Sequence, residues 1–305
     1  MDVVFSTIMN NVRNFHCLFL FFLVLALSGC RSQTTQPQGE GAATYTIQNK
    51  GSDTLVNLAL AWAERYQKIR PEVRLAVTGG GSGTGIAAIL NGTVDIANAS
   101  RQISVEELRA AAKLGIIPVE FVVSRDAIAV VVHLDNPVNQ LTIQQISDIY
   151  SGAINNWSEV GGDDRPIVRL SRETNSGTHV YFLEEVLRQG EPDDRTLFSQ
   201  DTLLLPSSEG ITAEVRDNPN AIGYEGLGYI NPEMKVLAIA QKAGQAYVMP
   251  TIETVNDNSY PIARDLYMYT PGEPSEAVAE YMEWIFSEEA QQIVAELGFV
   301  PVAAP

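Results

Sequence analysis

Three short segments of this chain share one layout, in which the end of an expected strand is followed by glycine and small hydroxyl residues and then by the start of an expected helix. They are residues 51–54 (GSDT), 79–85 (GGGSGTG) and 172–178 (RETNSGT). The start of a helix presents unpaired N–H groups and the positive end of the helix dipole, and Ser and Thr hydroxyls add donors. One such segment is more often an ordinary helix cap, but three that converge would surround a tetrahedral oxyanion.

The glycine run at 79–85 does not match the nucleotide-binding motifs. A P-loop needs Lys and then Ser or Thr after its last glycine, whereas Gly85 is followed by Ile86 and Ala87. The dinucleotide pattern GxGxxG fails in every frame, because a residue other than glycine falls where a glycine is required. The run therefore predicts an anion cradle without a nucleotide signature.

Arg172 is the candidate cation of the site. A guanidinium is a planar fork that can bind two oxygens of an oxyanion at once. The alternative is a surface salt bridge with Glu173, Glu184 or Glu185, and such a pair would contribute little to the stability of the fold. The hydroxyl and glycine residues at 176–178, directly after the arginine, favour the ligand role.

Segments with strand-like and helix-like periodicity alternate along the chain. The expected strands are 45–48, 73–77, 94–97, 127–133, 166–170, 221–224 and 263–269. The expected helices are 55–69, 86–90, 141–150 with Thr142 as its cap, 176–187, 211–215 and 275–297. This alternation predicts α/β units around a largely parallel sheet.

The N-terminus predicts export and a lipid anchor. Residues 17–27 (CLFLFFLVLAL) are too few to span a bilayer as a helix, Arg13 precedes them, and small residues follow. The tetrad LSGC at 27–30 resembles the bacterial lipobox, so Cys30 is the expected lipidation site. An ordinary signal with a chance cysteine, or a transmembrane anchor, stays open. We expect residues 1–29 to be a signal peptide, and residues 30–44 to hold the lipidated cysteine and a flexible, polar tether.

Charge excludes some partners. The chain has 20 basic and 37 acidic residues and a net charge of −17, which argues against nucleic acid and against a polybasic membrane patch. An acidic surface also opposes anion binding. However, salt screens distant carboxylates beyond about 8–10 Å, while dipoles and one arginine would act on a bound anion at short range. The acidic surface therefore chiefly slows encounter and favours solubility.

Residues from about 48 to 302 resemble the phosphate-binding proteins of phosphate ABC transporters. The resemblance rests on GSDT followed by a helix with Trp62, on GGGSGTG, on TVDIANASR, on RETNSGT and on NPNAIGY. It implies a two-lobed periplasmic-binding-protein fold of type II, in which each lobe is a mixed, mainly parallel sheet flanked by helices. Lobe 1 would comprise 45–125 with 262–305, and lobe 2 would comprise 126–261. The chain would cross between them near 124–126 and 260–264.

The resemblance also implies function. The protein would bind inorganic phosphate in the cleft between the lobes and deliver it to the transmembrane permease subunits of an ABC importer. It would be an extracytoplasmic monomer in the periplasm or on the outer surface of the cell membrane. It would have no catalytic residues, no cofactor and no metal. Carried over by position, the ligand-binding residues would be Ser52, Asp53, Thr54, Leu55, Ser82, Ser100, Arg101, Arg172, Ser176, Gly177 and Thr178.

Ser100 departs from the family pattern. Well-known members have an aspartate at the matching position, which accepts the proton of phosphate and repels fully ionised sulfate. Serine can donate and accept, so it would repel sulfate less. Asp53 is the candidate substitute acceptor, and a helix N-cap role for it stays equally open. Arg101 either adds a second positive charge or pairs with a surface carboxylate.

Three alternatives remain at this stage. The first is another oxyanion, such as sulfate or molybdate, on the same fold. The second is a secreted hydrolase or phosphatase with Ser82 or Ser176 as nucleophile, although no G-x-S-x-G elbow occurs and the histidines beyond the signal are His133 and His179. The third is a sensing module that has lost transport.

Overall fold

The computed structural model describes residues 45–302. The predicted signal peptide, Cys30 and the tether lie outside these residues. Within 45–302, no helix combines the length and the apolar character needed to cross a membrane.

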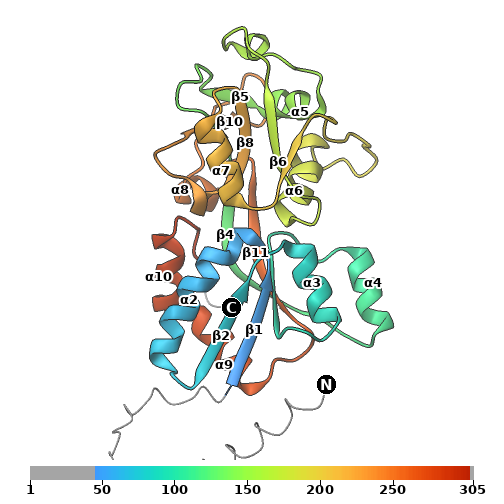
Figure 1. Cartoon of the computed structure of the whole chain (residues 1–305), viewed down its shortest axis with the longest axis vertical. Helices are drawn as coiled ribbons and strands as arrows, with labels where there is room; N and C mark the ends of the chain where they lie inside the picture. Colours follow the sequence, from blue (N-terminus) through green and yellow to red (C-terminus); the bar gives the residue numbers. More distant parts are fainter. Residues whose placement is uncertain (1–44, 303–305) are drawn as a thin grey trace, which may run out of the picture. The chain divides into compact units, whose positions relative to one another are not determined.

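A nine-stranded mixed sheet runs through the described residues (Figure 1). Its strand order is β2-β1-β3-β11-β4-β8-β6-β7, and β9 also pairs with β4. The strands are β1 (Tyr45–Gly51), β2 (Val73–Thr78), β3 (Ile96–Ala99), β4 (Val119–Val132), β6 (Val168–Arg172), β7 (Leu203–Leu205), β8 (Ala221–Gly226), β9 (Lys235–Val236) and β11 (Ala263–Thr270). A separate pair joins β5 (Gln140–Thr142) and β10 (Ala238–Ala240).

Each half of the sheet contains one group of three parallel strands. β1 pairs with β2 and β3, and β6 pairs with β7 and β8, all in parallel. β4 and β11 are antiparallel to their neighbours. The prediction of a mixed α/β fold is confirmed, and the antiparallel pairings of these strands are those made by β4 and β11.

The long strand β4 belongs to both lobes. Its first part pairs with β11 as far as Ala127, and its second part pairs with β8 from Ile128 onward. Separate hydrophobic cores lie on the two sides of this change of partner. One core lies around β1–β3 and includes Ile47 and Ile96. The other lies around β5, β6 and β8 and includes Leu141 and Ile222. We use "first lobe" for the β1–β3 side and "second lobe" for the β6–β8 side.

Helices cover both faces of the first lobe (Figure 1). Ile96 on β3 packs in one core with side chains of α2, α9 and α10, whereas its neighbour Ala97 packs with Ile86 of α3. Successive side chains of a strand point to opposite faces, so α3 lies across the sheet from α2. The α-helices are α2 (Val56–Ile69), α3 (Ser82–Leu90), α4 (Val105–Lys113), α5 (Ile143–Ser151), α6 (Gly177–Phe182), α7 (Ser208–Asp217), α8 (Ile252–Asn256), α9 (Glu276–Ile285) and α10 (Glu288–Glu296). A π-helical turn (Leu183–Leu187) continues α6, and 3₁₀ turns span Asp53–Leu55, Trp157–Val160 and Leu227–Tyr229.

The predicted single helix over 275–297 is wrong, because the chain breaks between α9 and α10. Ser287 is the N-cap of α10, and its hydroxyl accepts a hydrogen bond from the Ala290 N–H at 3.3 Å. Two glutamates follow it, as the positive end of a helix dipole favours. The expected packing of this segment on the first lobe is confirmed, since the indole N–H of Trp62 donates to the Ala290 carbonyl at 2.9 Å.

Several predicted boundaries shift by a few residues. The third strand occupies 96–99 rather than 94–97, and β6 occupies 168–172 rather than 166–170. Helix α3 starts inside the glycine run, at Ser82, after Gly81 adopts a φ of +89° that favours glycine. This early start places the Ser82 hydroxyl at the first turn of the helix.

Candidate functional site

Four buried hydroxyl side chains meet where the two lobes face each other: Thr54, Ser82, Ser100 and Thr178. The hydroxyl oxygens of Thr54 and Thr178 are 2.9 Å apart, those of Ser82 and Ser100 are 3.3 Å apart, and those of Ser100 and Thr178 are 3.5 Å apart. We call these four residues the hydroxyl cluster.

The fold explains how the hydroxyl cluster assembles. Thr54, Ser82 and Ser100 follow the carboxyl ends of β1, β2 and β3, which are parallel and so end at one edge of the sheet. Thr178 comes from α6 of the second lobe. The three predicted segments (51–54, 79–85 and 172–178) each lead into a helical turn, as expected. Residues of all three meet in the hydroxyl cluster.

Gly177 permits the close approach of the second lobe. A Cβ atom on this residue would lie 2.3 Å from the Ser82 hydroxyl and 2.6 Å from the Ser100 hydroxyl. Both distances are far below a normal contact, so a side chain here would displace the hydroxyl cluster.

Arg172, the last residue of β6, is 1% exposed and reaches across to the first lobe. Its Nη2 donates to Asp53 Oδ2 at 2.8 Å, and its Nη1 donates to the Ser208 hydroxyl at 2.9 Å. Asp53 Oδ1 accepts the Gly80 N–H at 3.0 Å. The alternative of a salt bridge between Arg172 and a surface glutamate is therefore wrong. The helix-cap alternative for Asp53 is also wrong, because Leu55 is the N-cap of α2 and the Asp53 carboxylate accepts from Arg172 and Gly80 instead.

Ser52, Leu55 and Ser176, the other predicted residues in or directly after these segments, form hydrogen bonds within the turns or next to them. The backbone N–H of Ser52 donates to the Asn98 carbonyl at 2.9 Å, and the N–H of Leu55 donates to the Ser52 carbonyl at 3.1 Å. Ser176 is the N-cap of α6, and its hydroxyl accepts from the His179 N–H at 3.5 Å.

Arg101 is not part of the hydroxyl cluster. Its two terminal nitrogens each donate to a different carboxylate oxygen of Glu107, both at 2.8 Å. Of the two alternatives open for Arg101, the structure supports pairing with a carboxylate on its own lobe.

Asn175 of the second lobe is hydrogen-bonded to the glycine run of the first lobe, and this contact was not predicted from the sequence. Its side-chain amide donates to the Gly80 carbonyl at 3.0 Å, and its own carbonyl accepts the Gly83 N–H at 3.1 Å. The position of Asn175 inside the RETNSGT segment was the available signal.

Asp126, Arg264 and Glu225 are buried charged residues that were not predicted from the sequence. Arg264 contacts the hydroxyl cluster, with Nη2 3.5 Å from the Thr54 hydroxyl. Burial raises the pKa of the Glu225 carboxyl well above its usual range, while the nearby charge of Arg172 and a hydrogen bond with Ser208 oppose the shift. Arg264 lies inside the predicted strand 263–269, and Asp126 and Glu225 lie directly beside the predicted strands 127–133 and 221–224. Charges in or beside these largely apolar strands were the available signal.

The raised pKa of Glu225 leads to a stability prediction. The stabilisation from its protonated form is fully present below the ordinary pKa of about 4.3 and is lost as pH rises through the folded-state pKa. Glu225→Gln removes this dependence. We expect the variant to gain free energy of unfolding relative to wild type by about 1.4 kcal/mol per pH unit above about 4.3, until the folded-state pKa is reached. Urea unfolding of both proteins over a pH series measures this, and a pH-independent difference would contradict it.

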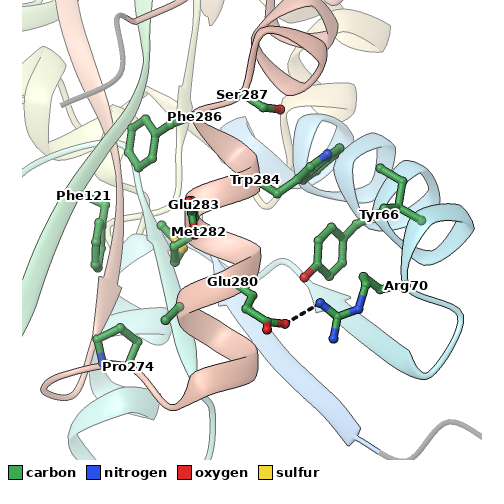
Figure 2. Close-up of a pocket in the computed structure, with 12 residues that line it drawn as sticks. Tyr66, Arg70, Phe121, Pro274, Glu280, Met282, Glu283, Trp284, Phe286 and Ser287 are labelled. Carbon is green, nitrogen blue, oxygen red and sulfur yellow. Dashed lines mark hydrogen bonds and ion pairs between the residues drawn. The ribbon is translucent and has the colours of Figure 1, made fainter.

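A pocket of about 900 Å³ lies on the first lobe between α2 and α9 (Figure 2). Tyr66, Met282 and Trp284 line its apolar part, and Arg70 at its edge pairs with Glu280. None of its lining residues belongs to the hydroxyl cluster or contacts it through a hydrogen bond. The candidate site is therefore the cluster between the lobes.

The two lobes are joined by the paired strands β4 and β11, and buried hydroxyl groups and an arginine lie where the lobes meet. This arrangement defines a bilobal ligand-binding protein. The sequence matches the PBP superfamily domain over residues 36–289. This chain belongs to the PBP superfamily and, within it, to the family of the PstS proteins.

Two PstS relatives illustrate the similarity. The phosphate-binding protein PstS of Pseudomonas aeruginosa is 33% identical over 284 residues, which cover 88% of this chain and 86% of the relative. The phosphate-binding protein PstS of Bacillus subtilis is 30% identical over 273 residues, covering 89% and 86%.

The chain is also similar in fold to solved structures of proteins from phosphate transport. A Clostridium perfringens protein assigned to phosphate ABC transport, with bound phosphate, has a TM-score of 0.76 at 32% identity and covers 84% of this chain and 99% of its own. An ABC-type phosphate transport receptor from Vibrio cholerae has a TM-score of 0.66 at 28% identity, with coverage of 84% and 100%.

Proposed function

We propose that this protein binds inorganic phosphate between its lobes and delivers it to the permease of an ABC importer. The observation that carries the proposal is the meeting of Arg172 and Thr178 of the second lobe with Asp53 and Thr54 of the first. The names of the PstS relatives and the phosphate in the Clostridium perfringens structure support this ligand.

The proposed ligand set follows the contacts. Hydroxyl groups and N–H groups would donate to the phosphate oxygens, and Arg172 would balance their charge. The set comprises Thr54, Leu55, Ser82, Ser100, Arg172, Ser176, Gly177 and Thr178, with Ser52 shaping the first turn. Asp53 orients Arg172, and the second lone pair of one of its carboxylate oxygens is the proposed acceptor for a phosphate proton. Arg101 is left out, because Glu107 holds its guanidinium.

Closure of the lobes is part of the proposal. Lobe 1 would comprise 45–125 with 262–305, lobe 2 would comprise 126–261, and the ribbon of β4 and β11 would be the hinge. Ligands from both lobes are satisfied together only when the lobes are closed, so binding would favour the closed state.

The proposed setting is extracytoplasmic, in the periplasm or on the outer surface of the cell membrane. A lipid on Cys30 would hold a monomer at the membrane through the tether, beside the permease subunits. The LSGC tetrad supports the anchor.

The hydrolase alternative lacks a general base. The ring of His179 is hydrogen-bonded to the Ser171 hydroxyl at 3.0 Å, and within 45–302 no histidine ring is bonded to the hydroxyl of Ser82 or Ser176. The PstS relatives are named as binding proteins.

Isothermal titration of the chain without residues 1–29 tests the proposed function. We expect phosphate and arsenate to bind, and sulfate and molybdate to bind at least about 100-fold more weakly, because an unprotonated oxyanion would place its lone pairs against Asp53. Sulfate binding as tight as phosphate binding at neutral pH would overturn phosphate specificity. Absence of phosphate binding would overturn the function itself.

A further inference from the structure

The ribbon of β4 and β11 carries two cross-strand Arg–Asp pairs in consecutive positions. Asp126 is opposite Arg264, and Arg125 is opposite Asp265. Successive side chains of a strand point to opposite faces, so the two pairs face opposite ways. The Asp126–Arg264 pair is buried, at 0% and 2% side-chain exposure, whereas the side chains of Arg125 and Asp265 are 27% and 42% exposed.

The buried pair faces the hydroxyl cluster. Arg264 Nη1 donates to the Ser100 carbonyl at 3.0 Å, and Nη2 lies 3.5 Å from the Thr54 hydroxyl. Arg264 therefore contacts two of the four cluster residues, while Arg172 approaches the same place from the second lobe.

Asp126 fixes the orientation of this guanidinium. Its Oδ2 accepts from Arg264 Nη2 at 2.9 Å and from Nε at 3.3 Å, and its Oδ1 accepts the Leu227 N–H at 2.9 Å. Both carboxylate oxygens are thus occupied. The pair presents N–H groups to the cluster rather than a carboxylate.

Arg264 keeps donor capacity for a ligand. A guanidinium has five N–H groups, and Nη1, which carries two of them, makes one hydrogen bond in the structure. The guanidinium also lines a cavity of about 700 Å³ between residues 101–106 and 180–185, and it lies 5.7 Å from the centre of the Tyr181 ring. A cation with a free donor, buried beside four hydroxyls, is suited to an anion.

We propose that Arg264, oriented by Asp126, is a second guanidinium of the anion site and binds phosphate together with Arg172. This inference rests on the proposed function. It gives the site a cation from the ribbon of β4 and β11, on the side of Ser100, whose carbonyl accepts from Arg264 Nη1. The bound anion would then contact the first lobe, the second lobe and the ribbon that joins them.

The test compares Arg264→Gln with Arg125→Gln, which breaks the exposed pair on the other face of the same ribbon. Titration with inorganic phosphate gives Kd, and urea unfolding without phosphate gives stability separately. We expect Arg264→Gln to raise Kd by at least about tenfold, because a charge-assisted hydrogen bond contributes about 1.5–3 kcal/mol. Arg125→Gln should leave Kd within about twofold of wild type, since its charge lies on the solvent side.

Two further variants separate binding from support of the fold. Arg264→Lys keeps the charge and should recover part of the lost affinity. The exchange Asp126→Arg with Arg264→Asp keeps a cross-strand ion pair but moves the guanidinium to the other strand, so it should bind as weakly as Arg264→Gln. If the exchanged protein does not fold, the comparison of Arg264→Gln with Arg264→Lys decides.

The outcomes distinguish the inference from the proposed function. Wild-type protein that does not bind phosphate overturns the proposed function and this inference with it. Wild-type protein that binds, with folded Arg264→Gln binding equally well, overturns the inference alone. Equal losses in the glutamine and lysine variants, with lowered stability in both, would assign Arg264 to support of the fold and also overturn it.

Discussion

Replacing Arg172 by alanine is expected to weaken phosphate binding by about 100-fold or more. Four of the five N–H groups of Arg172 donate within the protein, and the remaining N–H on Nη1 would donate a charge-assisted hydrogen bond to the anion. Its loss would cost about 1.5–3 kcal/mol. The change would also leave the Asp53 carboxylate without its cation, next to Thr54 of the hydroxyl cluster, where its charge would repel the ligand. Isothermal titration with phosphate measures the effect.

Arg101→Ala is the matched control for this prediction. Both arginines belong to predicted site segments, but Glu107 holds Arg101 away from the hydroxyl cluster. We expect the control to change Kd by less than about threefold, as is usual for removal of a pair outside a site. Similar losses in the two variants would show that Arg172 does not bind the anion.

Replacing Gly177 by alanine is expected to abolish closure around phosphate without unfolding the protein. Alanine is the better helix former, so α6 itself should form. Its Cβ would lie 2.3 Å from the hydroxyl of Ser82 and 2.6 Å from that of Ser100, both on the other lobe. The lobes would have to stay apart, and we expect a loss of affinity of about 100-fold or more, since contacts from both lobes are needed together.

Titration and small-angle scattering, with and without phosphate, check this result. Gly210→Ala is the matched control, because Gly210 also lies near a helix start of the second lobe and a Cβ there would meet its nearest atom at 3.6 Å. The control should bind and close like wild type. Binding by Gly177→Ala within a few-fold of wild type would refute the steric account.

The hydroxyl cluster could be predicted because its signals are local. Thr54, Ser82 and Thr178 each sit in a short stretch in which strand, turn and helix start follow one another, so their arrangement at a sheet edge follows from parallel pairing. The resemblance to a known family added Ser100, whose own segment lacks such a pattern.

The residues that were missed depend on non-local pairing. Arg264 lies in an alternating stretch (ARDLYMY) whose polar positions are typical of an exposed strand face, and its burial follows from pairing with a strand about 140 residues earlier. Glu225 is buried because β8 lies between β4 and β6. Local periodicity contains no information on either arrangement.

The prediction of a single helix over 275–297 was wrong although a local signal for the break was present. Apolar residues recur at helical spacing in α9 and again in α10, so the presence of helical periodicity on both sides of the break suggests one helix. The cap at Ser287 and the two glutamates after it were a local signal that the hydrophobic pattern obscured.

The two chain crossings between the lobes are hydrogen-bonded to each other, since β4 and β11 pair from Val119 with Thr270 to Ala127 with Ala263. Opening therefore cannot proceed as free swinging on two independent linkers. It has to twist and bend a two-stranded ribbon, which resists sideways sliding of one lobe past the other. The lobes would thus separate along a restricted path that the bending and twisting of this ribbon determine.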